Sequence, residues 1–259
     1  MRELTFGFSP CPNDTFAFHA LVHGLVEAPF RVRPVLLDIE ELNGAAAVGR
    51  FDLTKLSVGA MPSSPRYSML RSGAALGHGV GPLVVAREPI SLGDAVAGRL
   101  AIPGRQTTAF LLLRLLGGEP AEAVELRFDL ILDAVARGEL DAGLIIHESR
   151  FTYADHGLVR VADMGELWEA KTSLPVPLAT ICARDDLHLR DKAEAAIRAS
   201  VEYAFAHPDA SAGYVAAHSQ EMSPEVCRQH IELYVNEFSI DVGDDGLAAI
   251  EALTSAVPA

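Results

Sequence analysis

The sequence has few cysteines, and their arrangement excludes two common kinds of small scaffold. Only Cys11, Cys182 and Cys227 occur in 259 residues. Their odd number and wide spacing exclude a disulfide framework, and no CxxC pair is present to hold zinc. Positive charge is also scarce, because 21 Lys and Arg stand against 35 Asp and Glu, a formal net charge of -14. Without a run of basic residues, nucleic acid and membrane surfaces are poor candidate partners.

Long apolar runs and a secretory leader are also missing. Stretches such as Phe110 to Leu116 fall far short of the roughly 20 apolar residues that a bilayer span requires. The first residues run directly into the strand-like Leu4 to Phe8, without the charged segment, apolar core and cleavage site of a signal peptide. We therefore expect a cytoplasmic protein. Hydrophobic residues make up 49% of the chain, enough to bury a core in one compact domain or two lobes.

Short apolar runs alternate with helical patterns along the first part of the chain, which is the rhythm of βαβ units. Strands are expected at residues 4–8, 30–36, 53–58, 82–86, 99–102, 124–128 and 142–146. Helices are expected at residues 14–22, 39–48, 108–116 and 130–137, and then at 192–206, 224–238 and 246–255. The fold class is therefore α/β, with a mostly helical last third and no Gly/Ser linker between lobes.

One helix-turn-strand pattern occurs twice. Gly49-Arg-Phe-Asp52 and Gly138-Glu-Leu-Asp141 each follow an amphipathic helix and lead into an apolar strand. Gly can end a helix in the left-handed conformation, and Asp can tie the turn. The pattern is either an internal repeat or common loop chemistry. Under both interpretations Ser57 and His147 fall at strand carboxyl ends, the edge where open α/β sheets bind ligands.

A second pair of similar strands indicates where two lobes would be joined. Residues 83–87 and 179–184 are both apolar and end in Ala-Arg, followed by an acidic residue. Two such crossings would join a first lobe, made of residues 1–86 and 182–259, to a second lobe of residues 87–181. This layout is that of a clamshell that closes around its ligand.

The loop Ser9 to Thr15 lies between the first strand and the first helix. Its prolines fix an extended path, and Asn13 or Asp14 can cap the helix, whose N-terminus also offers free N–H groups to an anion. The cap alone explains both residues, whereas the loop as a whole is expected to contribute to a site. Cys11 is either an activated thiolate or a buried structural thiol, and the latter is favoured because no histidine stands beside it in the sequence.

The segment Pro103 to Phe110 combines a strand end, a glycine turn and a helix start. Thr107 and Thr108 gather hydroxyls and backbone donors where a carboxylate could bind. Alternatively, one threonine merely caps the helix. Arg105 is interpreted as a solvated surface residue.

The segment Gly143 to Phe151 delivers a histidine to the end of an apolar strand. An imidazole has an ordinary pKa of about 6.5 and is well suited to accept a proton near neutral pH. His147 is either structural or part of a site, and its position at the presumed cleft favours the site. Glu148 is expected on the opposite side, as a surface or supporting group.

The other histidines are weaker candidates for a functional site. His19 and His23 share a helix face, but no third metal ligand is in view. His78 lies in the Gly77 to Gly81 turn, which lacks the features of a phosphate loop. No dinucleotide fingerprint, kinase motif or nucleophile elbow is present, so chemistry without a cofactor or metal is the simplest expectation.

Four ordered motifs resemble those of a known family. They are Ser9 to Thr15, Thr54 to Ser57, Pro103 to Ala109 and Gly143 to Phe151, with Tyr234 to Ser239 in addition. On these motifs the chain resembles, over almost its whole length, the 1,4-dihydroxy-6-naphthoate synthases of the futalosine route to menaquinone. The resemblance implies a type 2 periplasmic-binding-protein-like fold with two interlobe crossings. It also implies a carbon-carbon lyase that converts cyclic dehypoxanthinylfutalosine to the naphthoate and a three-carbon fragment.

The resemblance further implies a set of site residues for this small anionic substrate. It makes His147 the proton acceptor. It places substrate contacts at Lys55, Leu56, Ser57, Thr108 and Ala109, and adds Asn43 and Thr107. Fragmentation with aromatisation needs a base and donors for a carboxylate and an oxyanion, which suits these residues. The motif Pro62 to Pro65 departs from the family pattern and leaves the cleft rim undefined.

Two rival functions share the same layout. A non-catalytic solute-binding protein has the same clamshell, because a fold alone does not give a function. A chorismate dehydratase of the same pathway would also bind a carboxylate between two lobes. The sequence does not indicate an oligomeric state.

Overall fold

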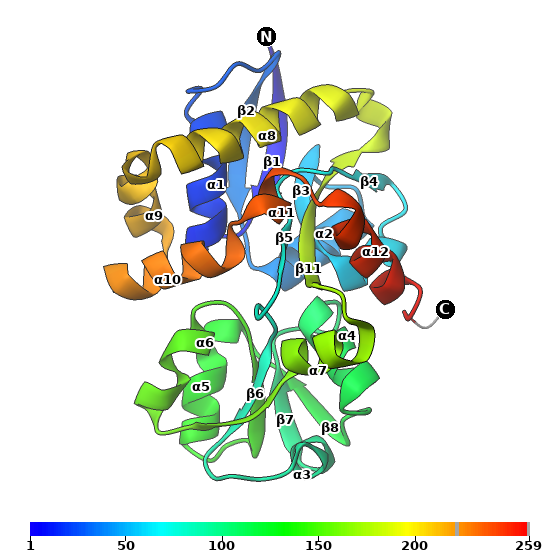
Figure 1. Cartoon of the computed structure of the whole chain (residues 1–259), viewed down its shortest axis with the longest axis vertical. Helices are drawn as coiled ribbons and strands as arrows, with labels where there is room; N and C mark the ends of the chain where they lie inside the picture. Colours follow the sequence, from blue (N-terminus) through cyan, green and yellow to red (C-terminus); the bar gives the residue numbers. More distant parts are fainter. Residues whose placement is uncertain (221–222, 258–259) are drawn as a thin grey trace.

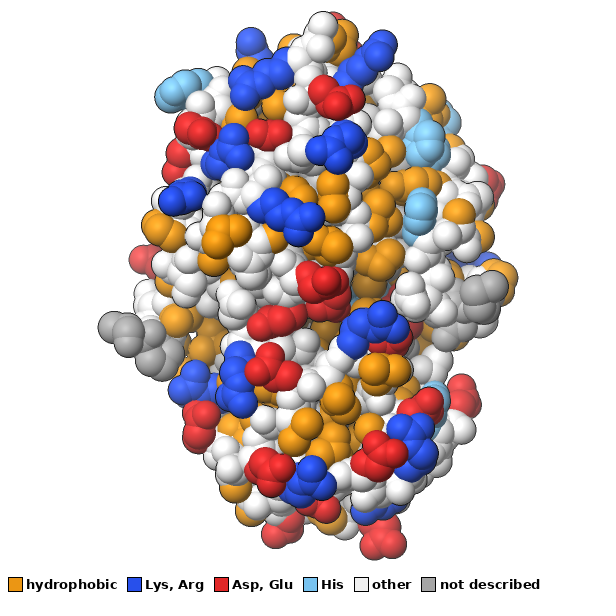
Figure 2. All heavy atoms as spheres, turned by 180° about the vertical axis from the view of Figure 1, so that it is seen from behind, with side chains coloured by type: hydrophobic (Ala, Val, Ile, Leu, Met, Phe, Trp, Pro, Cys, Tyr) orange, Lys and Arg blue, Asp and Glu red, His pale blue; other side chains and the backbone are white. Residues whose placement is uncertain are grey.

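The structure is a computed structural model that describes residues 1–220 and 223–257. The chain forms two lobes, each built around its own β-sheet (Figure 1). The first part of the chain and the last part share one lobe, whereas the middle part forms the other. On the face opposite to that view, acidic and basic side chains are interspersed over both lobes (Figure 2).

The first sheet has the strand order β2-β1-β3-β11-β4, and β5 also pairs with β11. Its strands are β1 (Arg2–Phe8), β2 (Phe30–Leu36), β3 (Leu53–Ser57), β4 (Tyr67–Met69), β5 (Ala75–Gly77) and β11 (Val176–Arg184). Strand β1 is parallel to β2 and β3, while β11 is antiparallel to β3 and β4.

The second sheet repeats this plan with the order β10-β6-β9-β7-β8. Its strands are β6 (Leu83–Ala86), β7 (Arg99–Ile102), β8 (Glu122–Glu125), β9 (Ala142–Ile145) and β10 (Val159–Asp163). Strand β7 is parallel to β8 and β9, and β6 is antiparallel to β9 and β10. In each sheet, therefore, three parallel strands are followed by antiparallel pairs, formed by β11 with β4 and β5 in the first sheet and by β6 with β10 in the second.

Helices pack around both sheets (Figure 1). Those of the first lobe are α1 (Pro12–Val22), α2 (Ile39–Ala47), α8 (Arg190–Ala206), α9 (Ala212–His218), α10 (Pro224–Tyr234), α11 (Glu237–Ile240) and α12 (Gly243–Thr254). Those of the second are α3 (Leu92–Ala97), α4 (Thr108–Leu116), α5 (Phe128–Ala136), α6 (Ser149–Thr152) and α7 (Met164–Thr172). Within the described part of the chain, no helix combines the length and apolarity that a membrane crossing needs.

The duplicated turn has the same geometry in both lobes. Gly49 and Gly138 have φ values of 74° and 75°, the left-handed conformation that a glycine adopts without strain. The Asp52 carboxylate accepts a hydrogen bond of 2.7 Å from the Thr5 backbone N–H in β1. The Asp141 carboxylate accepts the equivalent bond of 2.8 Å from the first residue of β7. The sequence repeat is therefore a structural repeat that fixes β3 and β9 to their sheets.

Aromatic packing fixes the start of the loop Ser9 to Thr15. The rings of Phe6, Phe8 and Phe18 lie with their centroids 4.9, 5.1 and 5.4 Å apart, and all three are fully buried. Burial of each such side chain contributes about 1.5–3 kcal/mol. Because Phe6 and Phe8 are in β1 and Phe18 is in α1, the loop between these elements is held at both ends.

Two element assignments from the sequence are wrong. The strand expected at residues 124–128 is β8, which ends at Glu125, and Phe128 begins α5 with its ring buried. The helix expected at residues 224–238 is two helices. Asn236 separates them, because its side chain accepts a hydrogen bond of 3.0 Å from the Phe238 N–H and so caps α11.

The chain changes sheets earlier than the sequence indicated. Strand β6 pairs within the second sheet and the whole of β11 within the first, so the changes come before Leu83 and before Val176 rather than at residues 87 and 182. At the first crossing Gly81 lies against Gly165, where a Cβ on Gly81 would be 2.1 Å from the Gly165 nitrogen. The turn Gly77 to Gly81 is therefore closely packed at its last residue.

Candidate active site

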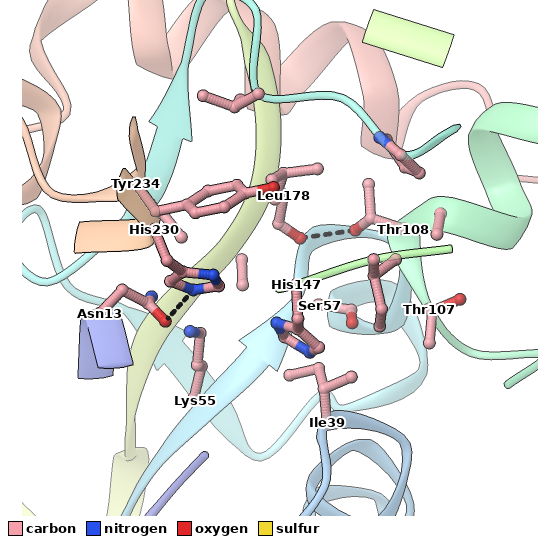
Figure 3. Close-up of a pocket in the computed structure, with 16 residues that line it drawn as sticks. Asn13, Ile39, Lys55, Ser57, Thr107, Thr108, His147, Leu178, His230 and Tyr234 are labelled. Atoms are coloured by element: carbon pink, nitrogen blue, oxygen red, sulfur yellow. Dashed lines mark hydrogen bonds between the residues drawn. The ribbon is translucent and has the colours of Figure 1, made fainter. Parts of the chain in front are cut away.

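A cavity that opens to solvent lies between the two lobes, beyond the ends of β3 and β9 (Figure 3). Ligands of open α/β sheets bind at this edge. Its lining comes from both lobes: Asn13, Ile39, Lys55, Ser57, Ala75, Val80, Pro82, Thr107, Thr108, Ala109, Ile146, His147, Leu178, Ala179, His230 and Tyr234.

His147 enters the cavity just after β9, in a backbone conformation that is uncommon for residues other than glycine. Its φ is 57°, and such left-handed residues cluster at functional sites. The ring packs edge-on against Phe128 at a centroid distance of 4.8 Å. Its Nε2 atom is buried and has no hydrogen-bond partner among the described residues.

Burial, and secondarily the positive charge of Lys55, lowers the pKa of His147 to about 3. The imidazole is therefore neutral at neutral pH and offers a lone pair to the cavity. A base with such a low pKa holds a proton only weakly, and a negative charge nearby would raise its pKa. The site thus supplies a proton acceptor whose strength depends on the charge of what binds beside it.

A buried ion pair forms the opposite wall. The Lys55 ammonium lies 2.5 Å from the Asp14 carboxylate, and the two side chains are only 4% and 3% exposed. The other oxygen of Asp14 accepts hydrogen bonds from the Ser9 N–H at 3.0 Å and the Ser9 hydroxyl at 2.7 Å. An ammonium has three N–H donors, and Asp14 takes one. The loop Ser9 to Thr15 therefore orients the buried cation of the cavity.

Successive side chains of β3 point to opposite faces of the sheet, so only alternate ones reach the cavity. Lys55 and Ser57 line it, whereas Leu56 is fully buried on the other face of the strand, packed with Ala46 and Cys182. The structure therefore does not bring the Leu56 side chain to the predicted site.

Asn43 lies behind Ser57 rather than in the cavity wall. Its amide oxygen accepts from the Ser57 N–H at 2.9 Å, and its amide nitrogen donates to the Ser57 hydroxyl at 3.0 Å. The same nitrogen lies 3.4 Å from the Gln106 carbonyl oxygen in the second lobe. Asn43 thus positions Ser57 and contacts the opposite lobe.

The start of α4 contributes backbone donors from the second lobe. Thr107 caps this helix, because its hydroxyl accepts from the Phe110 N–H at 3.2 Å. The Thr108 hydroxyl donates to the Leu178 carbonyl at 2.7 Å and accepts from the Gly59 N–H at 3.1 Å. Since both hydroxyls are engaged, an anion here would bind the N–H groups of the first turn, at Thr108 and Ala109.

His230 is the main site residue that the sequence analysis missed. It lies on the buried face of α10 with Cys227 and Tyr234, and it is only 1% exposed. Its Nε2 atom lies 3.0 Å from the Asn13 side-chain oxygen, across 217 residues of sequence. The rings of His147 and His230 have centroids 6.2 Å apart and an interplanar angle of 28°. A histidine on an otherwise apolar helix face was the only local signal.

Two expectations about the residues around His147 need correction. Glu148 is 5% exposed rather than a surface group, because β9 ends at Ile145 and the strand alternation stops there. The N-cap of α1 is Cys11, so neither Asn13 nor Asp14 fills that position. Burial, with the Glu148 carboxylate second, raises the pKa of the Cys11 thiol, which supports the buried-thiol interpretation.

Cys11, His147 and Glu148 also form a cluster of metal-donor types. One ligand atom from each lies within 4.8 Å of the other two. Thiolate, imidazole and carboxylate are zinc ligands, so this set has the chemistry to hold a metal ion. His19 and His23 belong to no such group of three among the described residues. Arg105 is on the surface as expected, paired with Glu125 at 2.8 Å.

Comparisons with known proteins match almost the whole length of the chain. A family model described as menaquinone biosynthesis matches residues 4–258. The 1,4-dihydroxy-6-naphthoate synthase of Thermus thermophilus is 54% identical over 256 residues, covering 98% of this chain and 93% of that protein. The enzyme of the same name from Streptomyces coelicolor is 45% identical over 262 residues, covering 96% and 91%.

Solved structures confirm the predicted periplasmic-binding-protein-like fold. A crystal structure of a protein from Archaeoglobus fulgidus has a TM-score of 0.92 and 35% identity, covering 98% of this chain and 96% of that one. The periplasmic aliphatic sulphonate binding protein of Escherichia coli has a TM-score of 0.67 and 13% identity, covering 98% and 86%. At that identity the second likeness concerns the fold alone.

Proposed function

The chain belongs to the menaquinone biosynthesis family, and on this premise we propose that it is a lyase that converts cyclic dehypoxanthinylfutalosine to 1,4-dihydroxy-6-naphthoate. The relatives named as naphthoate synthases and the four sequence motifs support the product. The reaction we propose is the cleavage of a carbon-carbon bond that releases a three-carbon fragment.

The observation that carries this proposal is the neutral imidazole of His147 with its unpaired Nε2 in the interlobe cavity. In our proposal His147 accepts the proton that initiates fragmentation. Burial and the charge of Lys55 hold the pKa of His147 at about 3. Negative charge that develops on the substrate beside the ring raises this pKa, so the base becomes stronger as the reaction proceeds.

In the same proposal, the substrate carboxylate binds to hydrogen-bond donors that line the cavity. The Lys55 ammonium and the N–H groups of Thr108 and Ala109 come from different lobes and line one cavity. Such preorganised donors stabilise an anion without reorganisation. Ser57, held by Asn43 on two sides, adds a hydroxyl whose position is fixed.

The test is an assay of purified protein with cyclic dehypoxanthinylfutalosine, with and without a chelator. We expect the naphthoate to form at the same rate in both, since the proposed steps use only side chains and backbone N–H groups of the protein. Loss of activity with the chelator would point to a metal, with Cys11, His147 and Glu148 as its ligands.

The rival functions give different results in the same experiment. If the protein formed no naphthoate but consumed chorismate, it would be a chorismate dehydratase. If it bound a small carboxylate and turned over neither compound, it would be a solute-binding protein, as the shared fold allows.

A further inference from the structure

The second imidazole of the cavity, His230, uses one of its two ring nitrogens in a hydrogen bond to Asn13. Nε2 lies 3.0 Å from the Asn13 side-chain oxygen. Nδ1 is buried and has no hydrogen-bond partner among residues 1–220 and 223–257. Figure 3 shows the bound nitrogen toward Asn13 and the other ring nitrogen toward the interior of the pocket.

A chain of hydrogen bonds determines which nitrogen carries the proton. The Asp14 carboxylate accepts from Lys55 at 2.5 Å and from the Asn13 amide nitrogen at 3.0 Å. Because that amide nitrogen is committed to a carboxylate, the Asn13 oxygen faces His230 and can only accept. His230 must therefore donate through Nε2–H, which leaves Nδ1 without a hydrogen.

The environment keeps this ring neutral. Burial, then the nearby His147 and Lys55, lowers the pKa of His230 well below its ordinary value. Neutral His230 with the proton on Nε2 can only accept a hydrogen bond at Nδ1. A buried acceptor without a partner is unfavourable, so the cavity is incomplete until a donor enters it.

We propose that His230 is a ligand-contacting residue whose Nδ1 accepts a hydrogen bond from a hydroxyl group of the bound substrate. This rests on the proposed function and sharpens it. The carboxylate lies at the donors of Lys55 and α4, and a hydroxyl-bearing part of the same molecule lies between the two imidazoles. His230 thereby selects carboxylates that carry a hydroxyl at that end, since a ligand without one leaves Nδ1 unpaired.

Two isosteric variants separate ligand contact from a structural role through Asn13. In His230→Gln, the terminal N–H occupies the position of Nε2, so the bond to Asn13 is kept and the Nδ1 acceptor is lost. In His230→Asn, a polar atom occupies the position of Nδ1 and the contact with Asn13 is lost. The two variants therefore remove opposite halves of the imidazole.

The experiment compares kcat/KM, thermal midpoint and ligand binding for wild type and both variants. We expect His230→Gln to keep the wild-type midpoint and to lose about tenfold or more in kcat/KM, and His230→Asn to lose less. The binding probes are 1,4-dihydroxy-6-naphthoate and 2-naphthoate, which lacks the hydroxyls. Wild type is expected to prefer the first, and His230→Gln to lose that preference.

The opposite ranking of the two variants would overturn the assignment of His230 as a ligand-contacting residue. If His230→Gln resembled wild type in kcat/KM and ligand preference while His230→Asn was impaired, the residue would act only through Asn13. Wild-type turnover is measured first, because its absence overturns the proposed function and this assignment together. With turnover present, the order of the variants decides the role of His230 alone.

Discussion

At the scale of single residues, the buried ion pair links the stability of the protein to the ligand binding that we propose. Lys55 and Asp14 are almost fully buried, and each gives the other its charged partner. Replacing one member of such a pair leaves an uncompensated buried charge, which costs more than the intact pair contributes. The ammonium is also the cation that lines the cavity.

Lys55→Met is predicted to reduce the free energy of unfolding by about 3–5 kcal/mol and to weaken carboxylate binding. Urea unfolding and calorimetric titration with 1,4-dihydroxy-6-naphthoate measure the two effects. The matched control is Arg105→Met, which breaks an exposed pair with Glu125 and should cost no more than about 1 kcal/mol. Equal losses in the two variants would contradict the role given to the buried pair.

Single residues also show where sequence reasoning reaches its limit. His147 could be found because it follows a recognisable strand, whereas His230 meets Asn13 only because α10 returns to the first lobe late in the chain. Glu148 was misplaced for a local reason, since the strand ends before His147 and the chain turns there. Neither a distant contact nor a left-handed turn at a non-glycine residue has a reliable signature in one sequence.

At the scale of elements, the duplicated helix-turn-strand unit explains how the site is constructed. Each copy ends a helix at a left-handed glycine and fixes the next strand with an aspartate. Strand β3 then delivers Lys55 and Ser57, and β9 leads to His147, from opposite lobes. The repeat was readable in the sequence because glycine and aspartate are used here for their backbone chemistry.

The residues at which the chain crosses between the lobes were harder to predict from the sequence. Ala-Arg endings marked the right strands but not the residue at which the chain leaves a sheet. That residue depends on pairing partners, because β6 bonds to β9 and β10 while β11 bonds to β3, β4 and β5. The close approach of Gly81 to Gly165 is likewise set by packing between distant segments.

Gly81→Ala is predicted to lower the free energy of unfolding by about 1–3 kcal/mol or more, because its Cβ would lie 2.1 Å from the Gly165 backbone. Gly213→Ala is the control. No atom of the described residues lies within 4 Å of a Cβ at that position in α9, so alanine should be neutral or stabilise the helix by up to about 1 kcal/mol. Thermal unfolding of both variants tests the contrast. Equal midpoints would show that the crossing tolerates a side chain.

At the scale of the whole molecule, the two lobes are in contact around the cavity. Thr108 binds Gly59 and Leu178, and the Gln106 N–H binds the Glu40 carboxylate at 3.1 Å. These bonds join the lobes beside the cavity, where His230 is buried and the Nε2 atom of His147 is out of contact with solvent. Burial of two neutral histidines in turn links folding to pH.

The stability of the protein should therefore depend on pH in a definite direction. The pKa of His147 is about 3 in the folded chain and about 6.5 when unfolded, so between these values the unfolded state binds more protons. Stability rises with pH across this window and is flat above it, and His230 acts in the same direction.

The prediction compares wild type with His230→Gln between pH 5 and pH 6.5. On acidification, the free energy of unfolding should fall more steeply for wild type than for His230→Gln. The difference in slope should reach up to about 1.4 kcal/mol per pH unit, because the variant lacks one titrating histidine. Urea unfolding across this range measures the two slopes. Parallel slopes would mean that His230 takes up a proton as readily in the folded chain as in the unfolded one.

The central claim is that His147 takes a proton from the bound substrate, and His147→Gln tests it most directly. The variant keeps a polar group at the position of Nε2 but has no basic nitrogen. Single-turnover assays with cyclic dehypoxanthinylfutalosine, together with product binding, measure chemistry and affinity separately. We predict a loss in rate of about 10²–10⁴-fold with a dissociation constant close to that of wild type. An unchanged rate would contradict the assignment of His147 as the base.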